Sequence, residues 1–203
     1  MGLKLLILGW WTPKYIMRKE LKNLSDKSIT TLEELLSKHV IKEFNDKNQK
    51  PAASIQKQRT IMAQTQAKLV ESLVAAIGRE ETIRLGREAL FLVGQDIGKQ
   101  TRLKLGLKYN PKDLTRAAKI LYRVLGIDFH LQWRDSSNAT AIIDRCPLAE
   151  NYSKLTCEVL SATDEGVIKG LQPNATMKFK KYMTNGCKNC RADIHFNEME
   201  TVQ

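Results

Sequence analysis

The hydrophobic period of this chain changes once, close to Gly126, and this change limits the folds that the chain can adopt. Upstream of Gly126, apolar residues recur every three or four positions, as on the buried face of a helix. From Ile127 to Arg134, apolar and polar residues alternate, which is typical of a half-buried strand. A helical half followed by strands predicts an α+β fold, with N-terminal helices packed on a small antiparallel sheet.

Capping and turn residues divide the helical half into separate helices. Residues 30–33 match a capping box, which satisfies free backbone N–H groups at the start of a helix. Asn110-Pro111 is typical of a cap followed by the first helical residue, and Gly126 ends that helix. The predicted helices cover residues 30–44, 53–77, 79–105 and 111–125.

The second half of the chain predicts two pairs of strands with one helix inserted between them. Pro147 is suited to the first position of the inserted helix. Asn185-Gly186 is a turn signal that joins the last two strands into a hairpin. The predicted strands cover residues 127–133, 139–145, 177–184 and 191–196. We therefore divide the chain into a helical extension at residues 1–50 and an α+β domain at residues 51–203.

Glycines recur at helical spacing within the predicted helix 79–105. Gly86, Gly94 and Gly98 share one stripe with Leu90. Each glycine inside a helix costs ~1 kcal/mol relative to alanine, so a compensating contact is expected. We favour close approach by another helix, and the alternative is room for a ligand against the backbone.

The positive charge of the chain lies in its helical half. The net charge is +11, yet residues 127–203 carry 9 Lys and Arg against 10 Asp and Glu, which leaves 24 against 12 for residues 1–126. Two interpretations stay open, an acidic partner such as nucleic acid or anionic lipid, and solvated helix faces. No run of Lys and Arg exceeds two residues, so we favour solvated faces and do not expect nucleic-acid binding.

No stretch of the chain reaches the ~18 consecutive apolar residues that a membrane-spanning helix needs. No small-residue cleavage site follows the Leu- and Trp-rich segment 1–11, so we do not expect a signal peptide. These features predict a cytoplasmic protein without a membrane span. Segment 1–11 is interpreted as an element packed on the body, and otherwise as a sticky edge for a partner, a membrane surface or a homodimer.

All four cysteines lie in the last third of the chain. Cys187 and Cys190 form a Cys-x-x-Cys, and ten residues separate Cys146 from Cys157. Cys157 lies roughly 200° around its helix from Leu155 and therefore off the apolar stripe where a merely buried thiol should sit. We predict that the four cysteines are ligands of zinc or, alternatively, of an iron–sulfur cluster. Unbound thiols and a disulfide or persulfide redox pair stay open.

Other polar residues of the second half are candidates for a site. His195 and Arg191 lie on the polar side of the last strand, where they form either a base and an anion contact or a solvated strand face. Asp164 follows the predicted helix of Cys157 and is interpreted first as a cap and otherwise as a group that orients a ligand. The chain has no phosphate-binding glycine loop and no serine nucleophile elbow.

Short segments of the second half carry a family resemblance, namely Arg145–Glu150, Leu155–Cys157, Asp164, Gly170–Pro173 and Gly186–Phe196. With them, the chain from about Thr82 onward resembles the L-2-amino-thiazoline-4-carboxylic acid hydrolase family and, more distantly, the 4-vinyl reductase domain superfamily. The resemblance implies a helical layer on an antiparallel sheet with a pocket between them. It also implies that Cys146, Cys157 and Cys190 take the places of the family's cysteines, whereas Cys187 stands where similar sequences often carry a carboxylate.

The resemblance further implies a hydrolase that opens a C–N or C–S bond of a small heterocyclic, thiazoline-type acid. In this hypothesis a metal held by the cysteines activates water, or a thiolate such as Cys157 attacks the ring carbon. Asp164 and His195 are further catalytic candidates, with His195 as the proton shuttle. Arg145 or Arg191 would bind the carboxylate of the substrate. The alternative hypothesis is a non-catalytic small-molecule-binding or redox- or metal-sensing module of the 4-vinyl reductase type.

Overall fold

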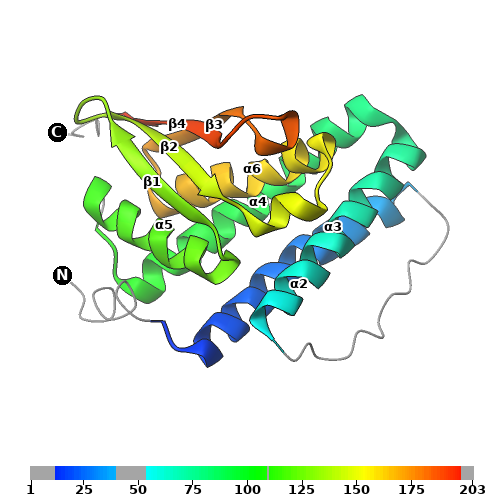
Figure 1. Cartoon of the computed structure of the whole chain (residues 1–203), viewed down its shortest axis with the longest axis horizontal. Helices are drawn as coiled ribbons and strands as arrows, with labels where there is room; N and C mark the ends of the chain where they lie inside the picture. Colours follow the sequence, from blue (N-terminus) through cyan, green and yellow to red (C-terminus); the bar gives the residue numbers. More distant parts are fainter. Residues whose placement is uncertain (1–11, 40–53, 109, 198–203) are drawn as a thin grey trace.

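The computed structural model describes residues 12–39, 54–108 and 110–197 of the chain (Figure 1). The described α-helices are α2 (Lys14–Ser37), α3 (Ile55–Ile77), α4 (Arg79–Leu105), α5 (Pro111–Leu125) and α6 (Lys154–Leu171). The described strands are β1 (Asp128–Trp133), β2 (Asn138–Arg145), β3 (Ala175–Lys181) and β4 (Cys190–Phe196), with short 3₁₀ helices at η1 (Pro147–Asn151) and η2 (Met183–Asn185). This order confirms the predicted α+β fold, with α6 inserted between the two strand pairs.

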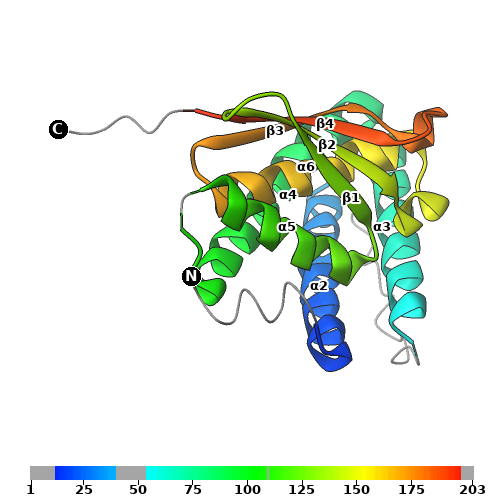
Figure 2. The same ribbon diagram turned by 60° about the vertical axis from the view of Figure 1, so that its left-hand side comes forward.

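The four strands form one antiparallel sheet in the order β1-β2-β4-β3. Figures 1 and 2 show α5 and α6 beneath one face of this sheet, with α4 behind α6 and the α2–α3 pair farther away. Ala141, Ala192 and Ile194 point from the strands into the core against these helices. Their neighbours along the strands, such as Arg191 and His195, are exposed on the opposite face.

Helices α4 and α6 approach each other closely through glycines on both sides. A Cβ atom added to Gly94 would lie 2.0 Å from the carbonyl oxygen of Thr163, and one added to Gly166 would lie 2.0 Å from that of Phe91. Neither helix can therefore carry a side chain at these positions without moving apart. This contact confirms that the glycine stripe of residues 79–105 serves helix packing.

The predicted start of the first long helix at Thr30 is wrong, because α2 already begins at Lys14 after Pro13. The apolar spacing continues upstream, and Leu21 and Leu32 are both buried on the same helix. The capping-box residues therefore lie inside α2. The predicted end near Phe44, the polar linker and segment 1–11 lie outside the described residues, and the division at residue 50 stays a prediction.

The segment after β2 contains a short 3₁₀ helix and a separate α-helix rather than one helix beginning at Pro147. Pro147 begins the 3₁₀ helix η1, and α6 begins at Lys154. Ser153 separates them because its hydroxyl accepts a hydrogen bond from the backbone N–H of Thr156 at 3.1 Å and caps α6. The predicted cap at Asn110 is confirmed in the same way, with Asp113 as the N–H donor at 2.9 Å.

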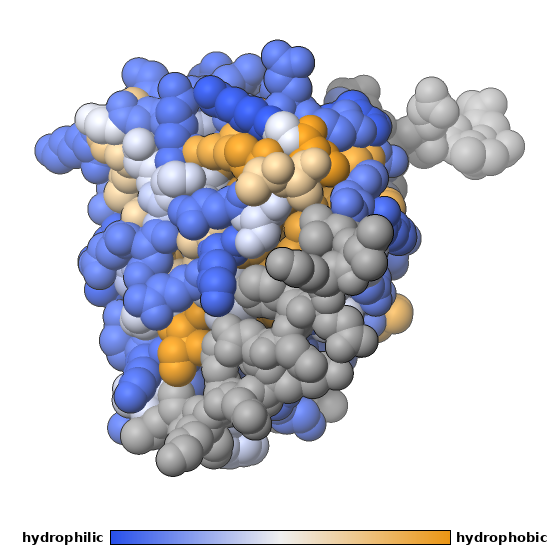
Figure 3. All heavy atoms as spheres, turned by 90° about the vertical axis from the view of Figure 1, so that its right-hand side faces the viewer, coloured by the Kyte–Doolittle hydropathy of each residue, from blue (hydrophilic) through white to orange (hydrophobic). Residues whose placement is uncertain are grey.

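The described surface carries few large apolar side chains. Leu92 and Leu103 on α4, with Tyr15 and Trp133, are the large exposed ones among the described residues. Figure 3 shows a mainly hydrophilic face at one end of the molecule, with hydrophobic residues in limited patches. Among the described residues, no helix is long and apolar enough to cross a membrane.

Candidate functional site

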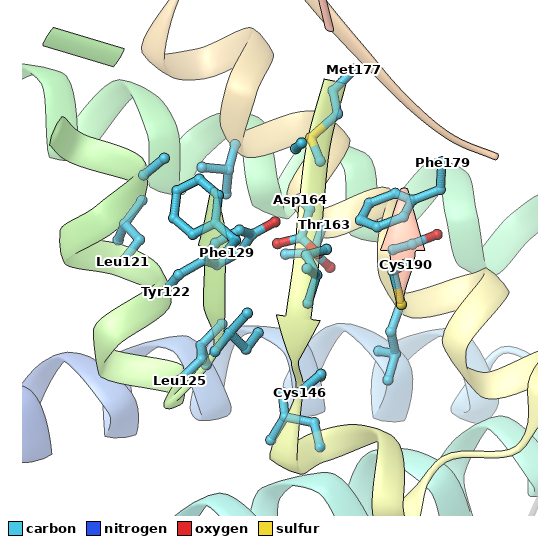
Figure 4. Close-up of a pocket in the computed structure, with 18 of the residues that line it drawn as sticks. Leu121, Tyr122, Leu125, Phe129, Cys146, Thr163, Asp164, Met177, Phe179 and Cys190 are labelled. Carbon is cyan, nitrogen blue, oxygen red and sulfur yellow. The ribbon is translucent and has the colours of Figure 1, made fainter. Parts of the chain in front are cut away.

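A pocket of about 140 Å³ lies between the inner face of the sheet and the helices (Figure 4). Most of its lining is apolar: Leu121 and Leu125 come from α5, Phe129 from β1, and Met177 and Phe179 from β3. An apolar cavity of ~150 Å³ accommodates a molecule the size of benzene. The size and lining therefore suit a compact ring or a short aliphatic body.

The carboxyl group of Asp164 is the one Asp or Glu side chain among the described residues that line this pocket. Asp164 and Cys157 are seven residues apart on α6, so two helical turns bring both onto the face that lines the pocket. Figure 4 shows Asp164 near the middle of the pocket, with Tyr122 and Phe129 on one side and Phe179 and Cys190 on the other. The earlier interpretation of Asp164 as a helix cap is wrong, because it lies inside α6.

Burial raises the pKa of Asp164 from its ordinary value of 3.8 to about 7. The desolvation of the carboxylate is the main cause, and the negative charge of the neighbouring Glu165 adds to it. A hydrogen bond from the Tyr122 hydroxyl acts in the opposite direction and stabilises the ionised form. The carboxyl group is thus able to gain and lose a proton near neutral pH, which suits a general acid or base.

Aromatic rings border the carboxyl group. The rings of Tyr122 and Phe129 meet edge to face, with centroids 4.7 Å apart. On the other side, Phe179 and Tyr182 stack with centroids 5.5 Å apart. These paired rings give the pocket stiff walls and present π-electron density beside the carboxylate.

Three of the four cysteines line the pocket, namely Cys146, Cys157 and Cys190. All are free thiols. Burial raises the pKa of Cys146 to about 11 and that of Cys157 to about 12. The pKa of Cys190 is also raised by burial, although its sulfur accepts a hydrogen bond from the Met183 N–H at 3.2 Å. At neutral pH these thiols are therefore neutral.

The predicted four-cysteine ligand set is not formed. Cys187 lies outside the residues that line the pocket. Within the part of the chain that the structure describes, no three His, Cys, Asp or Glu side chains are grouped so that they could hold a metal ion. The described residues thus do not assemble the predicted four-cysteine ligand set, and zinc or an iron–sulfur cluster stays a prediction.

The other predicted site residues lie on the outer face of the sheet or at its rim, away from the pocket lining. His195 is exposed, and its Nδ1 atom lies 2.6 Å from Oδ1 of Asn138. Arg145 pairs with Asp128 at 2.7 Å, and Arg191 donates to the side chain of Asn189 at 3.2 Å. Strand alternation separates His195 and Arg191 from Cys190, which points inward.

A buried polar chain also reaches the pocket and was not predicted from the sequence. The Tyr152 hydroxyl donates to Oε1 of Gln66, and Nε2 of Gln66 donates to the Ser28 hydroxyl at 2.7 Å. All three residues line the pocket. The sequence signal was Gln66 itself, because a glutamine on the apolar stripe of α3, four residues after Met62, needs buried partners.

An ion pair lies behind the pocket between α4 and α6. Arg87 pairs with Glu165 at 2.7 Å and donates to the Ser161 hydroxyl at 3.1 Å. The Ser161 hydroxyl lies 3.1 Å from the hydroxyl of Tyr182. The negative charge of Glu165 helps to raise the pKa of Asp164, although neither Glu165 nor Arg87 belongs to the pocket lining.

Comparisons with known proteins identify a family and a fold. The sequence profile described as L-2-amino-thiazoline-4-carboxylic acid hydrolase matches residues 58–194. This match spans more than half of the chain and includes Cys146, Cys157, Asp164 and Cys190. A comparison with curated protein sequences finds no match.

Two solved structures are similar in fold. The first is a trafficking protein particle complex subunit 3 from Naegleria fowleri covalently bound to palmitic acid, with a TM-score of 0.50 and 16% identity over 69% of this chain and 95% of that one. The second is an Fe(II) unliganded H-NOX protein from K. algicida, with a TM-score of 0.47 and 11% identity over 94% of this chain and 100% of that one. At 16% identity the likeness to the first structure concerns the fold alone.

Proposed function

Because the chain belongs to the L-2-amino-thiazoline-4-carboxylic acid hydrolase family, we propose that it is a hydrolase that opens a C–N bond of a small heterocycle held in the pocket. The observation that carries this proposal is the Asp164 carboxyl group, which lies in an apolar pocket with a pKa of about 7. A carboxyl group whose pKa lies near the pH of the reaction can both accept and donate a proton.

The reaction would need one water molecule and one proton carrier. The ionised Asp164 takes one proton from the water as the water oxygen bonds to the ring carbon between nitrogen and sulfur, and it passes this proton to the ring nitrogen. Asp164 then takes the second proton from the new hydroxyl group as the carbonyl forms, and it gives this proton to the ring nitrogen as the C–N bond breaks. The sum is the addition of one water molecule, and Asp164 ends in its starting state.

Direct attack by a cysteine is a weaker alternative. With a pKa of about 12, Cys157 is ionised in only about one molecule in 10⁴ at pH 8. Asp164 is largely ionised at the same pH. We therefore assign the proton transfer to Asp164 and the three thiols to the wall of the pocket.

A second candidate is ligand binding without reaction, because most of the pocket lining is apolar. The fold neighbour from Naegleria fowleri carries covalently bound palmitic acid, but that likeness concerns the fold. In either case the proposal places the protein in the cytosol, where its free thiols would stay reduced.

The test is a hydrolysis assay with cyclic amidines of the thiazoline class, in which mass spectrometry detects the gain of one water molecule. Asp164→Asn keeps the shape of the side chain and should lower turnover by about 10²- to 10⁴-fold, the range typical of general acid–base catalysis. Asp193→Asn is the matched control, because Asp193 lies on the outer face of the sheet and pairs with Arg134 at 3.0 Å. It should leave turnover unchanged.

The pH profile is an independent check. Turnover should rise as the pH increases through about 7, because Asp164 must be ionised to accept the proton. Equal turnover by the wild type and by Asp164→Asn would remove Asp164 from the mechanism. Tight binding of the amidines without any gain of water would favour the second candidate.

A further inference from the structure

The pocket contains one acidic side chain and no basic one among the described residues that line it. No Lys, Arg or His belongs to the lining, and the tyrosines and cysteines are neutral because burial raises their pKa values. The net charge of the lining is therefore zero when Asp164 is protonated and −1 when it is ionised. A ligand that carries a carboxylate would meet no opposite charge there.

The arginines near the pocket are held in other contacts. Arg87 is committed to Glu165 and to the backbone carbonyl of Glu158. Arg59 donates to the carbonyl oxygens of Val124 and Arg123 at the end of α5, at 2.9 Å each. Moving either arginine toward a ligand would take the donor from part-buried acceptors. Arg145 and Arg191, the two residues predicted to bind a carboxylate, lie outside the lining.

A cation, in contrast, fits the groups that are present. A protonated nitrogen beside Asp164 would form a charge-assisted hydrogen bond in an apolar environment, where such bonds are strong. The rings of Tyr122, Phe129 and Phe179 lie on both sides of Asp164 (Figure 4), and aromatic rings beside a bound cation attract it.

We propose that the substrate of this pocket is a small ring with a cationic nitrogen, such as a protonated cyclic amidine, and without a carboxylate. The inference rests on the proposed function in placing the substrate in this pocket. It departs from the carboxylic acid in the name of the family, because the carboxylate has no counter-charge in the lining of this chain. The cation pairs with Asp164, and the apolar body of the ring contacts Leu121, Leu125 and Met177.

Two related probes separate the cation from the carboxylate. The first is 2-amino-2-thiazoline, which has the amidine alone, and the second is L-2-amino-2-thiazoline-4-carboxylate, which adds the acid to the same ring. Isothermal titration calorimetry of the full chain at pH 7.5 should show binding of the first probe at least tenfold tighter than binding of the second. Asp164→Asn should weaken the binding of 2-amino-2-thiazoline at least tenfold. Asp193→Asn should leave the affinity for this probe unchanged.

The inference would be overturned if the wild type bound the carboxylate probe as tightly as the amidine probe, or more tightly. It would also be overturned if the wild type bound neither probe. Unchanged binding of the amidine by a folded Asp164→Asn variant would overturn it too. The comparison of the two probes uses only the wild type, so it decides the question even if the variant does not fold.

Mass spectrometry of the same mixtures separates this inference from the proposed function. Binding of 2-amino-2-thiazoline without a gain of water supports the cation site and contradicts the hydrolase. A gain of water by the carboxylate probe, with no preference for the amidine, supports the hydrolase and contradicts the cation site.

Discussion

The two sides of the sheet present similar residue types in different surroundings. On the inner side, Asp164 and Cys157 of α6 lie with Cys146 and Cys190 among the apolar side chains of the pocket, and burial raises the pKa values of all four groups. On the outer face and at its rim, acidic and basic side chains pair in solvent, as Arg134 does with Asp193 and Arg145 with Asp128. The carboxyl group of Asp164 thus has a raised pKa in the pocket, whereas the carboxylates of Asp193 and Asp128 pair with arginines.

The difference shows that residue type alone does not identify a site. The outer face carries the histidine and the arginines that a reader of the sequence would choose for catalysis and anion binding. These side chains are exposed, and they contact other outer or rim residues, namely Asn138, Asp128 and Asn189. On the inner side, the pocket holds Asp164 and three thiols among apolar side chains, and desolvation there alters their acid–base behaviour.

The largest effect is expected from placing a charge on the inner face. Ala192 is fully buried, whereas Arg191, next to it on β4, is exposed. Ala192→Asp should destabilise the fold by more than ~4 kcal/mol, because an unpaired carboxylate would enter the core. Arg191→Asp should change stability by less than ~1 kcal/mol. Urea denaturation would measure the stability of both variants. Similar losses of stability in the two variants would contradict the assignment of residues to the two faces.

The next effect concerns the cost of keeping Asp164 ionised. Its folded pKa of about 7 exceeds its ordinary value of 3.8, so the folded state binds its proton more tightly. Stability contributed by this group is present below pH 4 and is lost as the pH rises to about 7. Asp164→Asn does not titrate, so it should exceed the wild type in stability by about 4 kcal/mol at pH 8 and match it at pH 4.

Thermal and urea denaturation of the two proteins at both pH values would check this prediction. Asp193→Asn is again the control, and its stability should differ from that of the wild type by less than ~1 kcal/mol at either pH. A stability gain for Asp164→Asn that is the same at pH 4 and pH 8 would mean that the carboxylate charge is not its cause.

A smaller effect is expected in the reactivity of the thiols. Cys146, with a pKa of about 11, should react with iodoacetamide at pH 8 about 10²-fold more slowly in the folded protein than in urea, because only the thiolate reacts. Cys157 should be slower still. Cys187 lies outside the pocket and should be alkylated first. Peptide mapping by mass spectrometry would give the order, and early labelling of Cys157 would contradict it.

The smallest effects should follow substitutions on the outer face. His195→Ala and Arg191→Ala each remove one contact with an asparagine in an exposed position. We expect stability to change by less than ~1 kcal/mol and turnover to stay as in the wild type. A large loss of turnover in His195→Ala would return this histidine to the mechanism and move the site toward the outer face.

Local patterns in the sequence determined the fold class of this protein. The change from helical to alternating period near Gly126, the cap at Asn110 and the glycine stripe of α4 act over a few residues, and the structure confirms each of them. The start of α2 could not be located in this way, because the capping-box pattern of residues 30–33 also fits the interior of a longer helix.

Only the tertiary structure decided which reactive groups meet. Asp164 faces Tyr122, which comes from another helix 42 positions earlier, and neither residue signals the other in the sequence. Cys187 and Cys190 are neighbours along the chain, yet only Cys190 reaches the pocket. The reason is that burial and pairing depend on how the layers stack, and a pKa follows from those surroundings rather than from the residue type.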